Sequence, residues 1–124
     1  MSLELAIRYA RDNPIQSRGR SSISRMCTVL TDGRRVFWGW NSYKTSPLQA
    51  RFSQRTDNPQ RICTHSEIAA IAKAVRRGKV TDFSKYKMYV ARLLADGTTA
   101  LARPCVSCQQ AIEEFGIQQV EYTE

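Results

Sequence analysis

Two short segments, each at the start of an expected helix, constrain this chain more than any other feature of its sequence. The first is Cys63-Thr64-His65-Ser66-Glu67, which contains the only histidine of the 124 residues. Thr64 is a typical N-cap residue, and Glu67 has the spacing of a capping-box carboxylate. Apolar residues follow at three- to four-residue spacing, which predicts a helix that ends near Gly78. Its first turn would present His65 and Glu67 at the positive end of the helix dipole.

The second segment is Pro104-Cys105-Val106-Ser107-Cys108, which also starts an expected helix. Proline suits the first helical turn, and Gly116 is typical of the residue that ends a helix. A catalytic zinc ion takes three protein ligands and keeps one position for water, and His65, Cys105 and Cys108 supply three. Helix N-termini favour the thiolate form that zinc requires. Glu67 would then lie beside the metal as a general acid and base.

Together the two segments give the pattern H-x-E…P-C-x-x-C, the signature of zinc-dependent nucleobase deaminases. Residues 65–71, His-Ser-Glu-Ile-Ala-Ala-Ile, resemble the H-A-E-x-x-A-I of the cytidine/deoxycytidylate deaminase superfamily, with Ser66 where alanine is usual. Gly39-Trp40-Asn41 is similar to the segment that supplies a substrate-binding asparagine in its tRNA-adenosine and deoxycytidylate branches. The resemblance spans residues 1–122. It implies an α/β fold, a three-layer α/β/α sandwich with a mixed sheet, and we expect this chain to stop after the fourth strand, where the family usually adds a helix and a fifth strand.

The resemblance implies hydrolytic deamination of cytosine to uracil, with Zn²⁺ bound by His65, Cys105 and Cys108 and with Glu67 moving the protons. It also implies that the backbone N–H of Ser66 orients the base and that Asn41 binds the sugar. Two neighbours of Asn41, namely Trp40 and Lys44, are further candidates for substrate binding.

The pattern does not distinguish a free nucleotide from a polynucleotide. The family's free-nucleotide branch acts mostly on cytosine, and residues 68–103 form a longer spacer than most nucleic-acid-editing relatives have. A deoxycytidine nucleotide such as dCMP is therefore our preferred substrate. The net charge of +8 favours the alternative, which is cytosine deamination in single-stranded DNA or RNA. Purine deamination ranks third.

Two other classes of protein could use parts of this motif. Cys105 and Cys108 alone could form a thioredoxin-like redox pair. A non-catalytic zinc module would need a fourth protein ligand, such as Cys63, Cys27 or a carboxylate. Because neither class explains the histidine, the glutamate and both thiols together, the joint pattern favours the enzyme. We interpret Cys27 as a small buried apolar residue.

The remaining sequence predicts one domain over residues 1–124. We expect a helix over 2–11, strands over 23–30 and 35–40 joined by an Asp32-Gly33 hairpin turn, and later strands over 86–94 and 117–122. Apolar residues on both faces of 35–40 indicate a sheet covered on both sides. Residues 41–62 show no periodicity and are expected to form a long loop, with at most a helical turn at Leu48 and Phe52. We expect this loop to close over the substrate. One or two of its four cations would bind a phosphate of the substrate: Lys44, Arg51, Arg55 and Arg61.

The apolar runs are too short for a membrane span, and the start of the chain has no signal-peptide pattern. A metal-type cysteine pair without a secretory signal indicates a reducing compartment, so we expect a cytoplasmic protein. A homo-oligomer is left open by the sequence.

Overall fold

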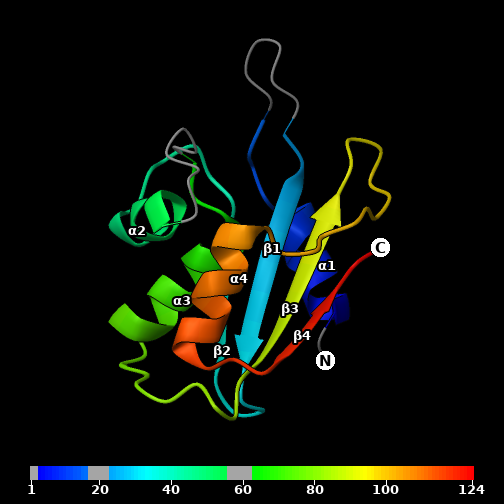
Figure 1. Cartoon of the computed structure of the whole chain (residues 1–124). Coiled ribbons are helices and arrows are strands. Elements are labelled where there is room, and N and C mark those ends of the chain that lie inside the picture. The colour runs from blue at the N-terminus through cyan, green and yellow to red at the C-terminus, as the bar shows by residue number, and fades with distance from the viewer. Residues whose placement is uncertain (1–2, 17–22, 56–62) are drawn as a thin grey trace.

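The structure, a computed structural model, describes residues 3–16, 23–55 and 63–124 (Figure 1). No helix in these ranges combines the length and the apolar character needed to cross a bilayer. The elements, in chain order, are α1 (Leu3–Arg11), β1 (Arg25–Thr31), β2 (Val36–Trp40), α2 (Pro47–Arg55), α3 (Ser66–Arg76), β3 (Lys87–Leu93), α4 (Val106–Phe115) and β4 (Gln119–Tyr122).

The four strands form one mixed sheet in the order β2-β1-β3-β4. Strand β1 runs antiparallel to both β2 and β3, whereas β3 and β4 are parallel. The expected hairpin between β1 and β2 is confirmed. Gly33 has φ of +96° in its turn, a left-handed conformation that glycine adopts without a steric cost.

Helices cover both faces of this sheet, so the predicted three-layer sandwich is confirmed (Figure 1). On one face α1 buries Ala6 and Ala10 against a cluster that includes Val29 and Leu93. The opposite face carries α3 and α4, and its larger apolar cluster extends from Leu30 to residues of both helices. Burial of these apolar side chains is the main term that holds the layers together.

Helix α3 lies directly on the sheet because β2 has a glycine beneath it. A Cβ atom on Gly39 would lie 2.6 Å from the backbone nitrogen of Ala70 and 2.7 Å from the Cβ of Ala69. No side chain fits there, so this glycine and the two alanines set the height of α3 above β2. The height of α3 in turn fixes where its first residues stand.

The prediction that residues 41–62 form an irregular loop was wrong for 47–55, where α2 forms. Ser46 begins this helix, because its Oγ accepts the backbone N–H of Gln49 at 3.1 Å. Phe52 is fully buried, and its ring lies 6.4 Å from the ring of Phe115 on α4. Tertiary packing therefore stabilises a helix that has little apolar periodicity of its own. Arg61 lies outside the described residues, as does the side chain of Arg55.

Candidate active site

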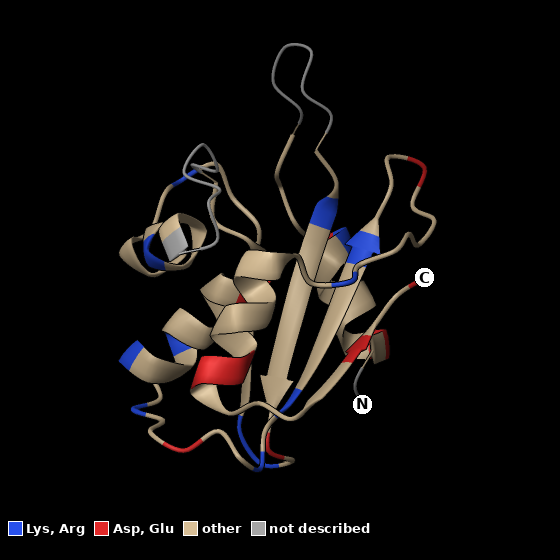
Figure 2. Cartoon of the chain, viewed as in Figure 1, with Lys and Arg blue, Asp and Glu red and all other residues tan. Residues whose placement is uncertain are grey.

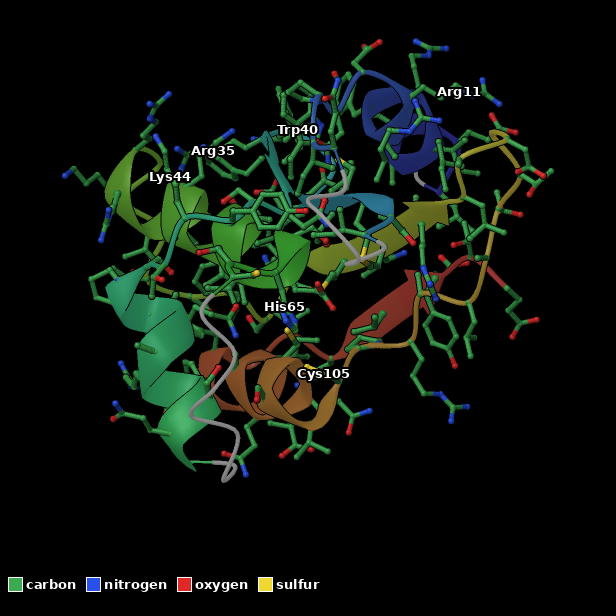
Figure 3. The ribbon with its side chains drawn as sticks, turned by 90° about the horizontal axis from the view of Figure 1, so that it is seen from above. Arg11, Arg35, Trp40, Lys44, His65 and Cys105 are labelled. Atoms are coloured by element: carbon green, nitrogen blue, oxygen red, sulfur yellow. The ribbon has the colours of Figure 1, made fainter. Side chains whose placement is uncertain are left out.

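The starts of α3 and α4 meet at one end of the molecule and bring the expected ligands together (Figure 3). His65 is the N-cap residue of α3, and Cys105 is the N-cap residue of α4. The Nδ1 atom of His65 lies 3.5 Å from the Sγ of Cys105 and 3.3 Å from the Sγ of Cys108. The three ligand atoms all lie within 4.8 Å of one another.

The helix starts differ in detail from the sequence prediction. Thr64 is not the N-cap of α3, since it precedes His65 and its hydroxyl donates to the carbonyl of Lys44. The His65 backbone N–H donates instead to Oε1 of Gln49 at 2.9 Å, and Gln49 is fully buried in α2. Pro104 likewise precedes the N-cap of α4 and does not lie in its first turn. Helix α2 therefore supplies the contact that holds the chain where α3 begins.

The three side chains fit a zinc ion. Tetrahedral zinc with Zn–N of about 2.0 Å and Zn–S of about 2.3 Å separates the nitrogen from each sulfur by about 3.5 Å. The separations of 3.3 and 3.5 Å agree with this value. Among the described His, Cys, Asp and Glu residues, no fourth side chain joins the group. A three-ligand group is typical of catalytic zinc, whereas a structural zinc module closes its site with four protein ligands.

The two sulfurs of this group titrate as a coupled pair. A hydrogen bond from Cys108, helped by the contact with His65, lowers the pKa of Cys105 to about 3 although burial acts in the opposite direction. The same hydrogen bond and the burial of Cys108 raise the pKa of that second thiol. Zinc binds both sulfurs as thiolates, so its binding releases protons from the cysteine pair.

Glu67 is 3% exposed and points into the same pocket without belonging to the ligand group. Burial raises the pKa of its carboxyl group. The Ser66 hydroxyl donates to its Oε1 at 3.2 Å, and the hydroxyl of Thr28 on β1 lies 2.8 Å from that of Ser66. Because Ser66 has one hydroxyl proton, Thr28 is the donor in the second bond. Hydrogen bonds from Thr28 on the sheet to Ser66, and from Ser66 to Glu67, therefore hold the carboxylate in place.

The pocket over these residues has a volume of about 340 Å³. His65, Glu67 and Cys105 lie in it together with Asn41 and Arg92. Ligand pockets of small molecules start at about 300 Å³, so this cavity has room for one compact ligand.

A family model described as "Cytidine and deoxycytidylate deaminase zinc-binding region" matches residues 3–124. The chain belongs to this family. Its fold is similar to the crystal structure of cytidine deaminase from Burkholderia pseudomallei, with a TM-score of 0.62 and 18% sequence identity, over 98% of this chain and 83% of that chain. The comparison with curated protein sequences found no match. The protein is therefore a hydrolase of the zinc-dependent deaminase family, and His65, Cys105 and Cys108 are its zinc-binding group.

Asn41 follows β2 directly and lies in the zinc pocket of this deaminase. Most of the hydrogen-bonding groups of its side-chain amide already have partners. Its Oδ1 accepts the backbone N–H of Met26 at 3.0 Å and an N–H of Asn13 at 2.8 Å. Its Nδ2 donates to the carbonyl of Ser24 at 2.9 Å. These contacts use both lone pairs of the oxygen and one of the two N–H groups. Asn41 therefore holds the end of α1 and the start of β1 to β2.

Trp40 and Lys44 do not lie in the zinc pocket. Both line a neighbouring cavity of about 570 Å³, and Asn41 lines this cavity as well as the zinc pocket. The indole N–H of Trp40 donates to the carbonyl of Tyr9 at 2.9 Å. Figure 3 shows Trp40 and Lys44 well apart from the facing side chains of His65 and Cys105.

The sequence reasoning missed four residues at the site: Gln49, Thr28, Arg92 and Arg103. A signal for the first was present, because Ser46-Pro47-Leu48-Gln49 has the S-x-x-Q spacing of a capping box with proline at the first helical position. Thr28 and Arg92 carry no local signal, since their positions at the site depend on how distant strands pair.

Proposed function

We propose that the protein catalyses zinc-dependent hydrolytic deamination of cytosine to uracil on a free deoxycytidine nucleotide such as dCMP. The observation that carries this proposal is the position of Glu67. Its carboxylate is buried in the same pocket as His65 and Cys105, yet it is absent from the group of zinc ligands. A general acid and base must lie close to the reacting water without being consumed as a metal ligand.

His65, Cys105 and Cys108 would hold the zinc ion, which would supply a water nucleophile at neutral pH. Glu67 accepts a proton from the water that adds to C4 of the base and delivers it to ring N3. It then carries the proton of the new C4 hydroxyl to the departing amine, so that the C4–N bond breaks and cytosine and water give uracil and ammonia. Burial raises the pKa of Glu67, which favours a carboxyl group that keeps the proton between the two transfers.

The other substrate contacts remain part of the proposal. We assign the backbone N–H of Ser66 to the orientation of the base. Asn41 would contact the sugar through its remaining N–H, because its oxygen already accepts two hydrogen bonds. Trp40 and Lys44 would contact only a substrate that extends beyond the zinc pocket.

The size of the zinc pocket supports a single nucleotide as substrate. Its volume of about 340 Å³ lies near the lower end of the range for ligand pockets.

One observation favours the second candidate, a single-stranded polynucleotide. The neighbouring cavity of about 570 Å³ combines two kinds of side chain that bind single strands, namely aromatic rings for stacking and lysines for phosphates: Trp38, Trp40, Tyr43, Lys44 and Lys73.

An activity screen with dCMP, deoxycytidine, dCTP and a cytosine-containing oligonucleotide tests the proposal. Glu67→Gln should keep zinc and the fold but lose about 10²- to 10⁴-fold in turnover. His65→Ala should lose both zinc and turnover, which metal analysis beside the kinetic assay will show. Normal activity of Glu67→Gln would refute the mechanism. Salt-sensitive oligonucleotide binding with deamination, and no turnover of dCMP, would favour the second candidate.

A further inference from the structure

The zinc pocket carries a guanidinium group that the sequence did not single out. Arg92 lies at the end of β3 and is half-buried. Its Nε donates to the hydroxyl of Ser24 at 2.9 Å, and its Nη1 donates to the carbonyl of Leu101 at 3.3 Å. Ser24 and Leu101 both line the pocket, so these two bonds fix the guanidinium of Arg92 at the pocket wall.

A second arginine, Arg103, lies on the segment that leads into α4, where it borders both the zinc pocket and a neighbouring cavity of about 210 Å³ that contains Tyr122. Arg103 stands two residues before the zinc ligand Cys105. Its Nε donates to the hydroxyl of Tyr122 at 3.3 Å, and its guanidinium lies 6.0 Å from the centre of that ring. Figure 2 shows the basic colour at the end of β3 and on the segment before α4, at the end of the sheet where α4 begins.

The charged side chains that line the pocket give it a net positive charge. Among the described residues that line it, Glu67 is the one carboxylate, while Arg92 and Arg103 supply two positive charges. The two thiolates of the zinc site balance the charge of the metal. The pocket is therefore complementary to an anionic ligand, and a neutral nucleoside would leave that net charge unpaired.

We propose that Arg92 and Arg103 bind the phosphate of the nucleotide and make this deaminase select a phosphomonoester over the corresponding nucleoside. This inference rests on the proposed deamination of a free nucleotide. An arginine has five N–H donors, and the described contacts use two in Arg92 and one in Arg103. The planar fork that remains suits phosphate oxygens. A phosphomonoester carries a charge of about −1.5 to −2 at pH 7, which both guanidinium groups can share.

The assignment differs from the sequence expectation, which placed the phosphate-binding cations in the segment between Asn41 and Ile62. Arg51 is engaged elsewhere, in an ion pair with Glu114 on α4. Lys44 lines the neighbouring cavity and not the zinc pocket. The cations that do line the zinc pocket come from β3 and from the segment before α4.

Kinetics with a matched pair of substrates tests the inference. Arg92→Gln and Arg103→Gln should each lower kcat/KM for dCMP by about 10- to 100-fold, as expected when a charged hydrogen bond is lost. For deoxycytidine the same variants should change kcat/KM by less than about threefold. Arg92→Lys should retain part of the activity on dCMP, because it keeps the charge but loses the fork. Arg34→Gln is the control, since Arg34 is an exposed cation in the β1–β2 turn, at the opposite end of the sheet.

Binding of the products dUMP and deoxyuridine to the zinc-loaded wild type and variants, measured by calorimetry, separates this inference from the proposed function. Tighter binding of dUMP that depends on Arg92 and Arg103 would support the phosphate site even if no cytosine compound were deaminated. Deamination by the wild type with equal binding of dUMP and deoxyuridine would overturn the phosphate site and leave the proposed activity standing. Equal losses of kcat/KM on dCMP and deoxycytidine in Arg103→Gln would overturn the phosphate site as well. Because Arg103 is exposed, this variant remains informative if Arg92→Gln does not fold.

Discussion

Replacing Gln49 by leucine would test whether α2 holds the zinc-binding helix in place. The change keeps a similar volume but removes the oxygen that accepts the His65 backbone N–H. Leaving a donor without its acceptor in this partly buried contact costs about 1–3 kcal/mol, and leucine cannot replace the bond that Gln49 makes to Ser53. We therefore expect the free energy of unfolding to fall by about 2 kcal/mol. For a domain of this size, about 4 °C of Tm per kcal/mol gives a decrease of about 8 °C.

Thermal melting of the zinc-loaded protein is the assay, and Gln54→Leu is the matched control. Gln54 lies on the same helix but is exposed, so its replacement should change Tm by little. Zinc affinity gives a second readout. Partners that orient metal ligands typically contribute about 10- to 100-fold to metal affinity, and we expect a decrease near the lower value because Gln49 bonds the backbone of His65. If Gln49→Leu melts and binds zinc like Gln54→Leu, the contact from α2 does not hold the start of α3.

Two further substitutions test how the site is supported from the sheet. Ser66→Ala should lower the free energy of unfolding by about 1–3 kcal/mol, since it leaves the buried Thr28 hydroxyl without its acceptor. Thr28→Val should lower it by about 1 kcal/mol, because Ser66 loses one hydrogen bond but keeps its bond to Glu67. The double variant should lose less than the sum in denaturant unfolding, and strictly additive losses would argue against the bond between them. Gly39→Ala should lower the free energy of unfolding by about 1–3 kcal/mol and weaken zinc binding, because its Cβ would push α3 away from β2. Unchanged Tm and metal content in Gly39→Ala would refute the close contact.

The zinc-binding group could be predicted from the sequence because each half of it is local. His65 stands at one helix start, and Cys105 and Cys108 share the first turn of another. The spacing of such residues is set by helix geometry and by little else. The hairpin at Gly33 was equally local, since its turn requires a left-handed residue.

The parts that could not be predicted depend on contacts between distant residues. Helix α2 is stabilised by Phe52 against Phe115, which lies 63 positions further along the chain, and helical periodicity does not contain that information. The choice between Thr64 and His65 as N-cap depends on Gln49, 16 residues earlier. Arg92 reaches the pocket because β3 pairs with β1, which brings it to Ser24 across 68 positions.

The long separation of the zinc ligands along the chain also makes the metal a cross-link that stabilises the fold. His65 and Cys105 are 40 positions apart, and the segment between them includes all of α3 and β3. A zinc ion that joins them closes this segment into a ring and restricts the unfolded chain, as a disulfide would. By the chain-entropy relation for disulfides, a ring of that length contributes about 4 kcal/mol. Zinc scarcity in a cell would therefore lower the amount of intact polypeptide, through unfolding and proteolysis, as well as the catalytic rate per molecule.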